Sequence, residues 1–183
     1  MRLLRLLAAP VAAGVMFLAQ AINAGPASAA ISDPHCHFDF VTFNACLRFW
    51  PGSEVNTLAP NVGLDSYMSE SHARDVAADI LAGNAPAFAQ LIGDDGPGHE
   101  QILAELPLKS GWPAAGPDGL GIEWSTLVQR AVLDEDKDGQ DEVFARLGYW
   151  DFQFGWKIFT TGTVQAEFAP IIVNPPGCVE ECP

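Results

Sequence analysis

Apolar residues between positions 69 and 81 recur with the period of an α-helix. Their spacing is three and four residues, which gives one apolar stripe along an amphipathic helix. Ser69 or Ser71 can cap its start, and Gly83 with Asn84 can end it. The stripe consists of Ala73, Val76, Ala77, Ile80 and Leu81. The pattern therefore predicts a helix over residues 69–81.

Two shorter helices are expected next along the chain. The first covers residues 86–92, with Asn84 as a cap, Pro86 in the first turn and Gly93 at its end. The second covers residues 97–106 and ends at Pro107. Pro and Gly are frequent over residues 107–121, which predicts a long loop.

The last third of the chain alternates apolar and polar residues and is rich in β-forming side chains. Residues 124–133 and 142–154 are expected to form a hairpin around the acidic segment 134–141. Two more strands are expected at residues 156–161 and 163–168.

Residues 30–63 are expected to form an extended arm that is rich in aromatic side chains. The alternation from His37 to Phe40 indicates a short strand within it. The whole pattern predicts an α+β fold in which N-terminal helices pack on a curved antiparallel β-meander. The α+β domain would span residues 64–169, followed by a tail rich in Pro and Cys at residues 170–183.

This order of elements resembles the nuclear transport factor two-like superfamily. The resemblance rests on Val76, Ile80 and Leu81, then Ala82-Gly83-Asn84, then residues 87–92, followed by four strands. It covers residues 64–168 and implies a cone-shaped fold with a pocket. Some members use an Asp and His pair in the cone, and others bind without catalysis. No such pair is recognisable here at matching positions, so the resemblance implies a pocket more than a chemistry.

The N-terminus has the pattern of a secretory signal. Two arginines precede an apolar stretch at residues 6–22, and Ala27-Ser28-Ala29 is a small-x-small cleavage site. The alternative is a membrane anchor, but Pro10, Gly14 and Gln20 interrupt the stretch. We expect export, cleavage after Ala29 and no membrane span in the mature chain.

The chain is strongly acidic, with 23 acidic and 9 basic residues and a formal charge of −14. Loss of residues 1–29, which contain two arginines and no acidic residue, makes the charge −16. Nucleic acids and anionic membranes are therefore poor partners. The sequence names no other partner.

Four cysteines follow the signal, which in an oxidising compartment predicts two disulfides. The local pairing joins Cys36 to Cys46 and Cys178 to Cys182. Cross pairing between the two ends of the domain stays open. A zinc or copper site built from His35, Cys36, His37 and Cys46 is the other alternative, but side chains alternate along an extended segment, so Cys36 would point away from the two histidines.

An acidic segment offers carboxylates at alternate positions before a glycine. The candidate calcium ligands are Asp134, Asp136, Asp138 and Glu142, and Gly139 permits a sharp turn. The spacing resembles the calcium loops of integrin-type FG-GAP repeats. An EF-hand would need a bidentate Glu where Ala145 stands. The alternative is a solvated acidic turn.

Aromatic residues alternate with polar ones near residue 150. One face would carry Trp150, Phe152, Phe154 and Trp156, and the other Tyr149, Asp151 and Gln153. The face with Trp150 and Trp156 is expected to lie under the helices. In a second hypothesis, part of this face lines an apolar pocket, and Tyr149, Asp151 and Gln153 lie at its rim.

Catalytic patterns are weak. Ser66, Ser69, Ser71 and His72 with Asp75 fall in a helix-capping region, and His99-Glu100 is a candidate acid–base pair without a recognised third group. We therefore expect a secreted binding or interaction domain without catalysis. The alternative is a small-molecule enzyme with a cone-shaped pocket, which buried Asp or His side chains inside the sheet would favour.

Overall fold

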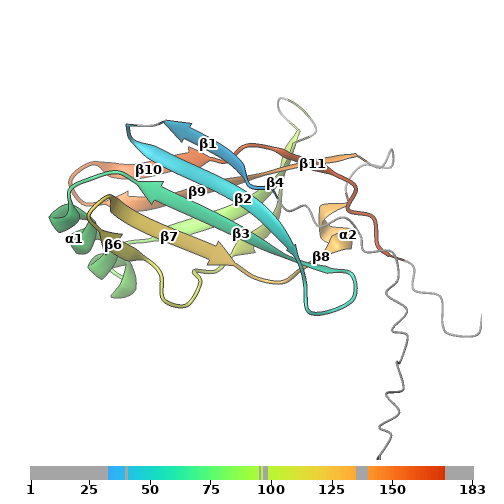
Figure 1. The fold of residues 1–183 in the computed structure, drawn as a ribbon, viewed down its shortest axis with the longest axis horizontal. Helices are drawn as coiled ribbons and strands as arrows, with labels where there is room; N and C mark the ends of the chain where they lie inside the picture. Colours follow the sequence, from blue (N-terminus) through green and yellow to red (C-terminus); the bar gives the residue numbers. More distant parts are fainter. Residues whose placement is uncertain (1–32, 40, 95, 97–98, 135–139, 172–183) are drawn as a thin grey trace, which may run out of the picture.

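The computed structural model describes residues 33–39, 41–94, 96, 99–134 and 140–171. In this part of the chain two antiparallel sheets are stacked face to face, with one helix at an end of the stack (Figure 1). Sheet A has the strand order β1-β2-β3-β7-β6, and β8 pairs with β3. Sheet B has the order β10-β9-β4-β5, and β11 pairs with β9.

The elements have the following bounds. Sheet A contains β1 (His35–Asp39), β2 (Phe43–Pro51), β3 (Thr57–Ser66), β6 (Ala114–Gly116), β7 (Gly119–Ser125) and β8 (Val128–Gln129). Sheet B contains β4 (Ala87–Asp94), β5 (Glu100–Leu106), β9 (Asp141–Asp151), β10 (Gly155–Thr160) and β11 (Val164–Ala166). The helices are α1 (Glu70–Leu81) and α2 (Arg130–Leu133).

The predicted α+β class is wrong, because the described residues form a β-rich sandwich with one helix of 12 residues and one of 4. The helix predicted at residues 86–92 is strand β4. It pairs with β9 on one side and with β5 on the other. A short run of mostly apolar residues fits the period of a helix as well as a strand, so periodicity alone does not distinguish the two.

Strand β5 replaces the helix predicted at residues 97–106. Its sequence contains good helix formers such as Gln, Leu, Ala and Glu, but pairing with β4 overrides this propensity. The predicted loop at residues 107–121 contains β6 and the start of β7. The predicted hairpin around the acidic segment is also wrong, because β7 lies in sheet A and β9 in sheet B.

Other predictions are confirmed. Ser69 caps α1 by accepting the N–H of His72, and Gly83 follows the helix with a positive φ of 74°. Strands β9, β10 and β11 lie close to the ranges predicted for the last third of the chain. The segment predicted as an arm contributes β1, β2 and most of β3 to sheet A.

The core lies between the two sheets. Every second residue of β2, β3, β7 and β9 points inward, and the largest buried side chains include Phe49, Trp124, Leu147 and Phe168. Helix α1 contacts β6 and β7 and buries Val76 and Ile80, so it closes one end of the sandwich (Figure 1).

Candidate functional site

A small hollow of about 100 Å³ opens on the outer face of sheet A. Its position follows from the strand register, in which Gly63 lies between Cys46 on β2 and Glu123 on β7. A Cβ atom built on Gly63 would have no atom within 4 Å. The missing side chain leaves the surface of the sheet open at this point.

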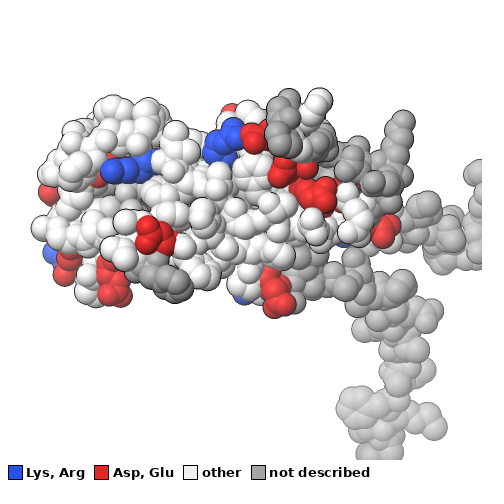
Figure 2. All heavy atoms as spheres, turned by 90° about the horizontal axis from the view of Figure 1, so that it is seen from above, with Lys and Arg blue, Asp and Glu red and all other residues white. Residues whose placement is uncertain are grey.

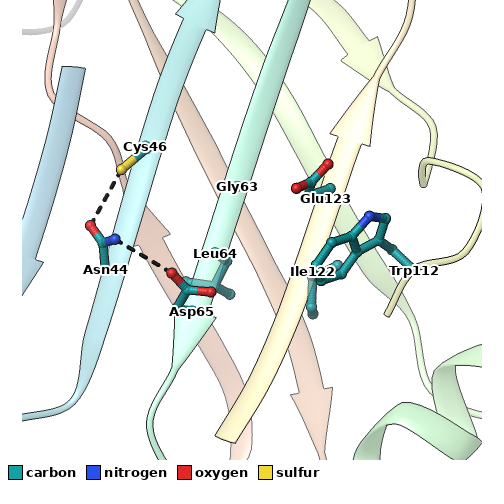
Figure 3. A pocket seen from close by; sticks show the side chains of 8 residues that line it. All are labelled: Asn44, Cys46, Gly63, Leu64, Asp65, Trp112, Ile122 and Glu123. Atoms are coloured by element: carbon teal, nitrogen blue, oxygen red, sulfur yellow. Dashed lines mark hydrogen bonds between the residues drawn. The ribbon is translucent and has the colours of Figure 1, made fainter. Parts of the chain in front are cut away.

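Trp112 forms one wall of this hollow (Figure 3). Its indole ring lies over Gly121 on β7, where an added Cβ would come within 2.7 Å of the ring. Two glycines on neighbouring strands thus leave two spaces, and Trp112 fills the one over Gly121 only. The complete lining is Asn44, Cys46, Gly63, Leu64, Asp65, Trp112, Ile122 and Glu123.

Two carboxylates lie at the rim of the hollow. Asp65 accepts a long hydrogen bond of 3.4 Å from Asn44 Nδ2 (Figure 3). Glu123 forms an ion pair with Lys109 at 2.5 Å and accepts a hydrogen bond from Asn61. Glu123 is therefore largely compensated, whereas Asp65 meets an amide and no cation among its described partners.

A second surface of interest is the outer face of sheet B around Gly148. We call it the aromatic face and define it by Phe88, Trp150, Trp156 and Ile158. Trp156 faces Trp150 across β10 and β9, and Ile158 faces Gly148. The Trp156 ring makes edge contacts with Phe88 at 5.7 Å and with Trp150 at 5.8 Å.

Gly148 permits this arrangement. Phe88 on β4 is its register partner, and a Cβ atom on Gly148 would approach the Phe88 ring to 3.0 Å. The aromatic face is open to solvent, since Trp156 is 45% exposed and Ile158 is 59% exposed. The prediction that helices cover the aromatic stripe of residues 150–156 is therefore wrong for Phe152, Phe154 and Trp156, which are all exposed.

A polar network joins the sheets at the end where α1 lies. The hydroxyls of Ser66 on β3 and Tyr149 on β9 are 2.8 Å apart. His72 Nε2 donates to Asp151 Oδ2 at 2.8 Å. Asp151 Oδ1 also accepts the N–H of Gln153 and, at 3.2 Å, that of Phe154.

Both buried acids of this network have shifted pKa values. Burial raises the pKa of Tyr149 above 10.0, the hydrogen bond with Ser66 opposes the shift, and the Asp151 charge adds to it. Burial also acts to raise the pKa of Asp151. Hydrogen bonds from His72, Gln153 and Phe154 and the charge of His72 outweigh it, so the pKa lies below 3.8.

The network contains a buried Asp paired with a His, which is the feature expected of the enzyme alternative. Both carboxylate oxygens of Asp151 are used within the protein, and the hollow at Gly63 lies on the opposite side of sheet A. The arrangement fastens α1 and the β9–β10 turn to the sandwich.

The candidate pocket residues therefore do not share one rim. Tyr149 and Asp151 point into the sandwich, and Gln153 lies in the exposed turn between β9 and β10. His99 is exposed, and its neighbour Glu100 forms an ion pair with Arg146. None of these residues lines the hollow at Gly63.

The candidate calcium ligands fall partly outside the described residues. Asp136 and Asp138 are not described. Asp134 follows α2, and Glu142 lies at the start of β9, where it accepts a hydrogen bond from Gln165. Within the described residues, no group of three or more His, Cys, Asp or Glu side chains could hold a metal ion. The calcium loop stays a prediction.

The predicted disulfide between Cys36 and Cys46 is present and joins directly opposed residues of β1 and β2. Cys178 and Cys182 lie outside the described residues. No helix of the described part is long and apolar enough to cross a membrane.

Sequence reasoning missed the hollow and the outward direction of Phe88. The available signal was an isolated glycine within an apolar strand pattern, which often marks a close approach or an opening at a sheet. Comparison with known proteins gives no further guide, because no protein family, curated protein or solved structure matches the chain.

Proposed function

We propose that this protein is an exported, non-catalytic interaction module that docks a partner protein on the aromatic face of sheet B. The observation that carries the proposal is the exposed cluster of Phe88, Trp150, Trp156 and Ile158. Export rests on the signal pattern at residues 1–29, and the Cys36–Cys46 disulfide is in keeping with it.

The composition of the aromatic face is that of an interface centre. Trp and Phe are enriched at the buried centres of protein interfaces, and Trp is frequent among residues that dominate binding energy. The neighbouring Arg146 is paired with Glu100, so the surrounding charge is locally balanced. An uncharged apolar partner surface can cover this cluster without leaving an unpaired charge buried.

Docking on the face is favoured over docking along the sheet edge. Strand β10 is the edge of sheet B, and its Lys157 lies with Nζ 4.9 Å from the Phe154 ring. A lysine on an edge strand disfavours pairing with another strand. Figure 2 shows the molecule from the side of β1 and β10, where most of the surface is uncharged.

The experiment compares the mature protein with Trp156→Ser and Ile158→Ser variants. Each is immobilised and incubated with the extracellular fraction of its own source. A retained protein is then purified and its Kd measured. We expect each substitution to weaken binding at least about tenfold, the loss of about 1.4 kcal/mol or more that is typical of a central interface residue.

Val41→Ser is the matched control, because Val41 is also an exposed apolar residue but lies in the β1–β2 turn. It should bind like the wild type. Equal binding by all four proteins, or no specific partner at all, would refute docking on the aromatic face. Sedimentation velocity tests the other possible occupant of the aromatic face, a second copy of this chain. Concentration-dependent dimers that are lost in Trp156→Ser would mean that a second copy covers the face.

A further inference from the structure

We propose that the hollow over Gly63 is a recognition site for one long basic side chain, Lys or Arg, supplied by a polypeptide partner. The proposal is independent of the aromatic face, since the hollow lies on the outer face of the other sheet. It rests on the size of the hollow, on its mixed lining and on the sign of its charge.

The size limits the ligand. A volume of about 100 Å³ is roughly three times the ~30 Å³ that a water molecule takes in the liquid. Pockets for drug-sized molecules occupy about 300–1,000 Å³. The hollow therefore accommodates the end of one side chain and not a whole cofactor or metabolite.

The lining matches a side chain that has an apolar stem and a charged end. The Trp112 indole and the sulfur of Cys46 offer apolar contact along the walls (Figure 3). The carboxylates of Asp65 and Glu123 stand at the rim. Lys and Arg place their methylene stems on apolar surface while the charged group stays at the edge in contact with water.

The charge selects a cation. Glu123 is paired with Lys109, but the hydrogen bond from Asn44 to Asp65 is long, at 3.4 Å, and brings no charge. The hollow thus keeps the negative charge of Asp65, in a molecule whose net charge is −14. An ammonium or guanidinium group is attracted to this site, and an acidic ligand is repelled.

A divalent metal ion is a poorer occupant. Calcium takes six to eight oxygen ligands, and the hollow offers two carboxylates and one amide, all of which already take part in hydrogen bonds. The carboxylates also come from neighbouring strands and are not directly opposed, because Glu123 pairs with Gly63 and Asp65 pairs with Gly121. A flexible basic side chain needs only one of them.

The test is an NMR titration of the ¹⁵N-labelled mature protein with three capped amino acids: N-acetyl-lysine methylamide, the arginine equivalent and the norleucine equivalent, which has an apolar stem without the charge. The lysine and arginine compounds should shift the amides of Gly63, Asp65 and Glu123 and the Trp112 indole N–H. We expect their Kd values to be at least about fivefold lower than that of the norleucine compound, and to rise with salt.

Two variants examine the hollow itself. Gly63→Val fills it, and the open space at the Cβ position predicts that the fold is kept. It should abolish the shifts. Asp65→Asn should reduce lysine binding to the level of norleucine. Ala59→Val is the control, because it also places a valine on the outer face of β3 but away from the hollow, and it should bind like the wild type.

The proposal is overturned if norleucine binds as well as lysine, if Gly63→Val binds like the wild type, or if the shifts map elsewhere. If Gly63→Val does not fold, lysine binding by Asp65→Asn is the deciding measurement, and binding equal to that of the wild type overturns the proposal. Two further ligands distinguish a polypeptide from a free amine as the source of the cation. One is a hexapeptide with one central lysine, and the other is free 1,5-diaminopentane. Binding of the diamine without binding of the peptide would overturn the assignment to a polypeptide partner.

Discussion

His72 Nε2 lies 2.8 Å from Asp151 Oδ2 and thereby joins the first turn of α1 to the end of β9. The same carboxylate accepts the N–H groups of Gln153 and Phe154 in the β9–β10 turn. The Asp151 side chain is only 2% exposed, so these contacts are weakly screened by solvent. One buried carboxylate thus holds a helix and a hairpin turn in their relative positions.

This contact predicts a loss of stability in acid. The pKa of Asp151 in the folded protein lies below its usual 3.8, so its stabilisation is present above that pH and is lost as the pH falls through the folded-state pKa. We expect Asp151→Asn to lower the free energy of unfolding by about 1.5–3 kcal/mol at neutral pH, because a charged hydrogen-bond partner is removed.

The measurement is urea unfolding at several pH values from neutral to about 2. The difference between wild type and Asp151→Asn should shrink as the pH falls. Asp65→Asn, which alters an exposed carboxylate, should change stability by less than about 0.5 kcal/mol. A constant difference between wild type and Asp151→Asn at all pH values would contradict the assigned role.

The β6–β7 turn contains two glycines, of which one has no room for a side chain and the other has open space. Gly119 has φ of 127°, and an added Cβ would lie 2.3 Å from the carbonyl oxygen of Ser66. Gly116, its register partner, would meet no atom within 4 Å. We expect Gly119→Ala to cost about 2–3 kcal/mol and Gly116→Ala less than about 0.5 kcal/mol in chemical unfolding. If both variants lost a similar free energy of unfolding, the positive φ and the close approach at Gly119 would not be the cause of the loss.

The Cys36–Cys46 disulfide fastens β1 to sheet A. It closes a loop with a sequence separation of 10, so the Cys36→Ser, Cys46→Ser double variant should lose about 2–3 kcal/mol by the chain-entropy estimate. Thermal unfolding measures this loss. We also predict that the mature protein has no free thiol, which labelling under denaturing, non-reducing conditions checks. Two reactive thiols per chain would contradict a Cys178–Cys182 bridge.

We still predict a weak calcium site in the acidic segment, built from Asp134, Asp136, Asp138 and Glu142. Calcium in the range of about 0.1–1 mM should raise the melting temperature, and magnesium should raise it less because it requires more rigid octahedral ligands. Asp136→Asn combined with Asp138→Asn should abolish the calcium effect. An equal shift in this double variant, or none in the wild type, would mean that the segment is only a solvated turn.

Local signals in the sequence determined α1 and the first disulfide. The capping serine, the apolar period of the helix and the glycine that follows it all lie within about fifteen residues, so a local stretch of sequence contains all of these signals. Cys36 and Cys46 are also near neighbours along the chain. The sequence likewise established that the chain is strongly acidic.

Only the tertiary structure decided β4 and β5. Their apolar spacing suits a helix as well as a strand, and the contacts that select the strand come from the distant β9, which pairs with β4. Similarly, the alternation around residue 150 predicted two faces, but the prediction that the aromatic one is buried is wrong. Shifting a strand by one residue exchanges its faces, so the burial of Tyr149 and the exposure of Trp156 depend on register and sheet packing.

The hollow is a product of register in the same way. Gly63 and Gly121 are far apart along the chain, and the sequence predicted an arm and a loop at these positions instead of two paired strands. Pairing of β3 with β7 places them on adjacent strands, and the loop before β6 supplies Trp112 to cover one of them. Which glycine stays open is set by side-chain packing across three strands, information that no local stretch of the sequence contains.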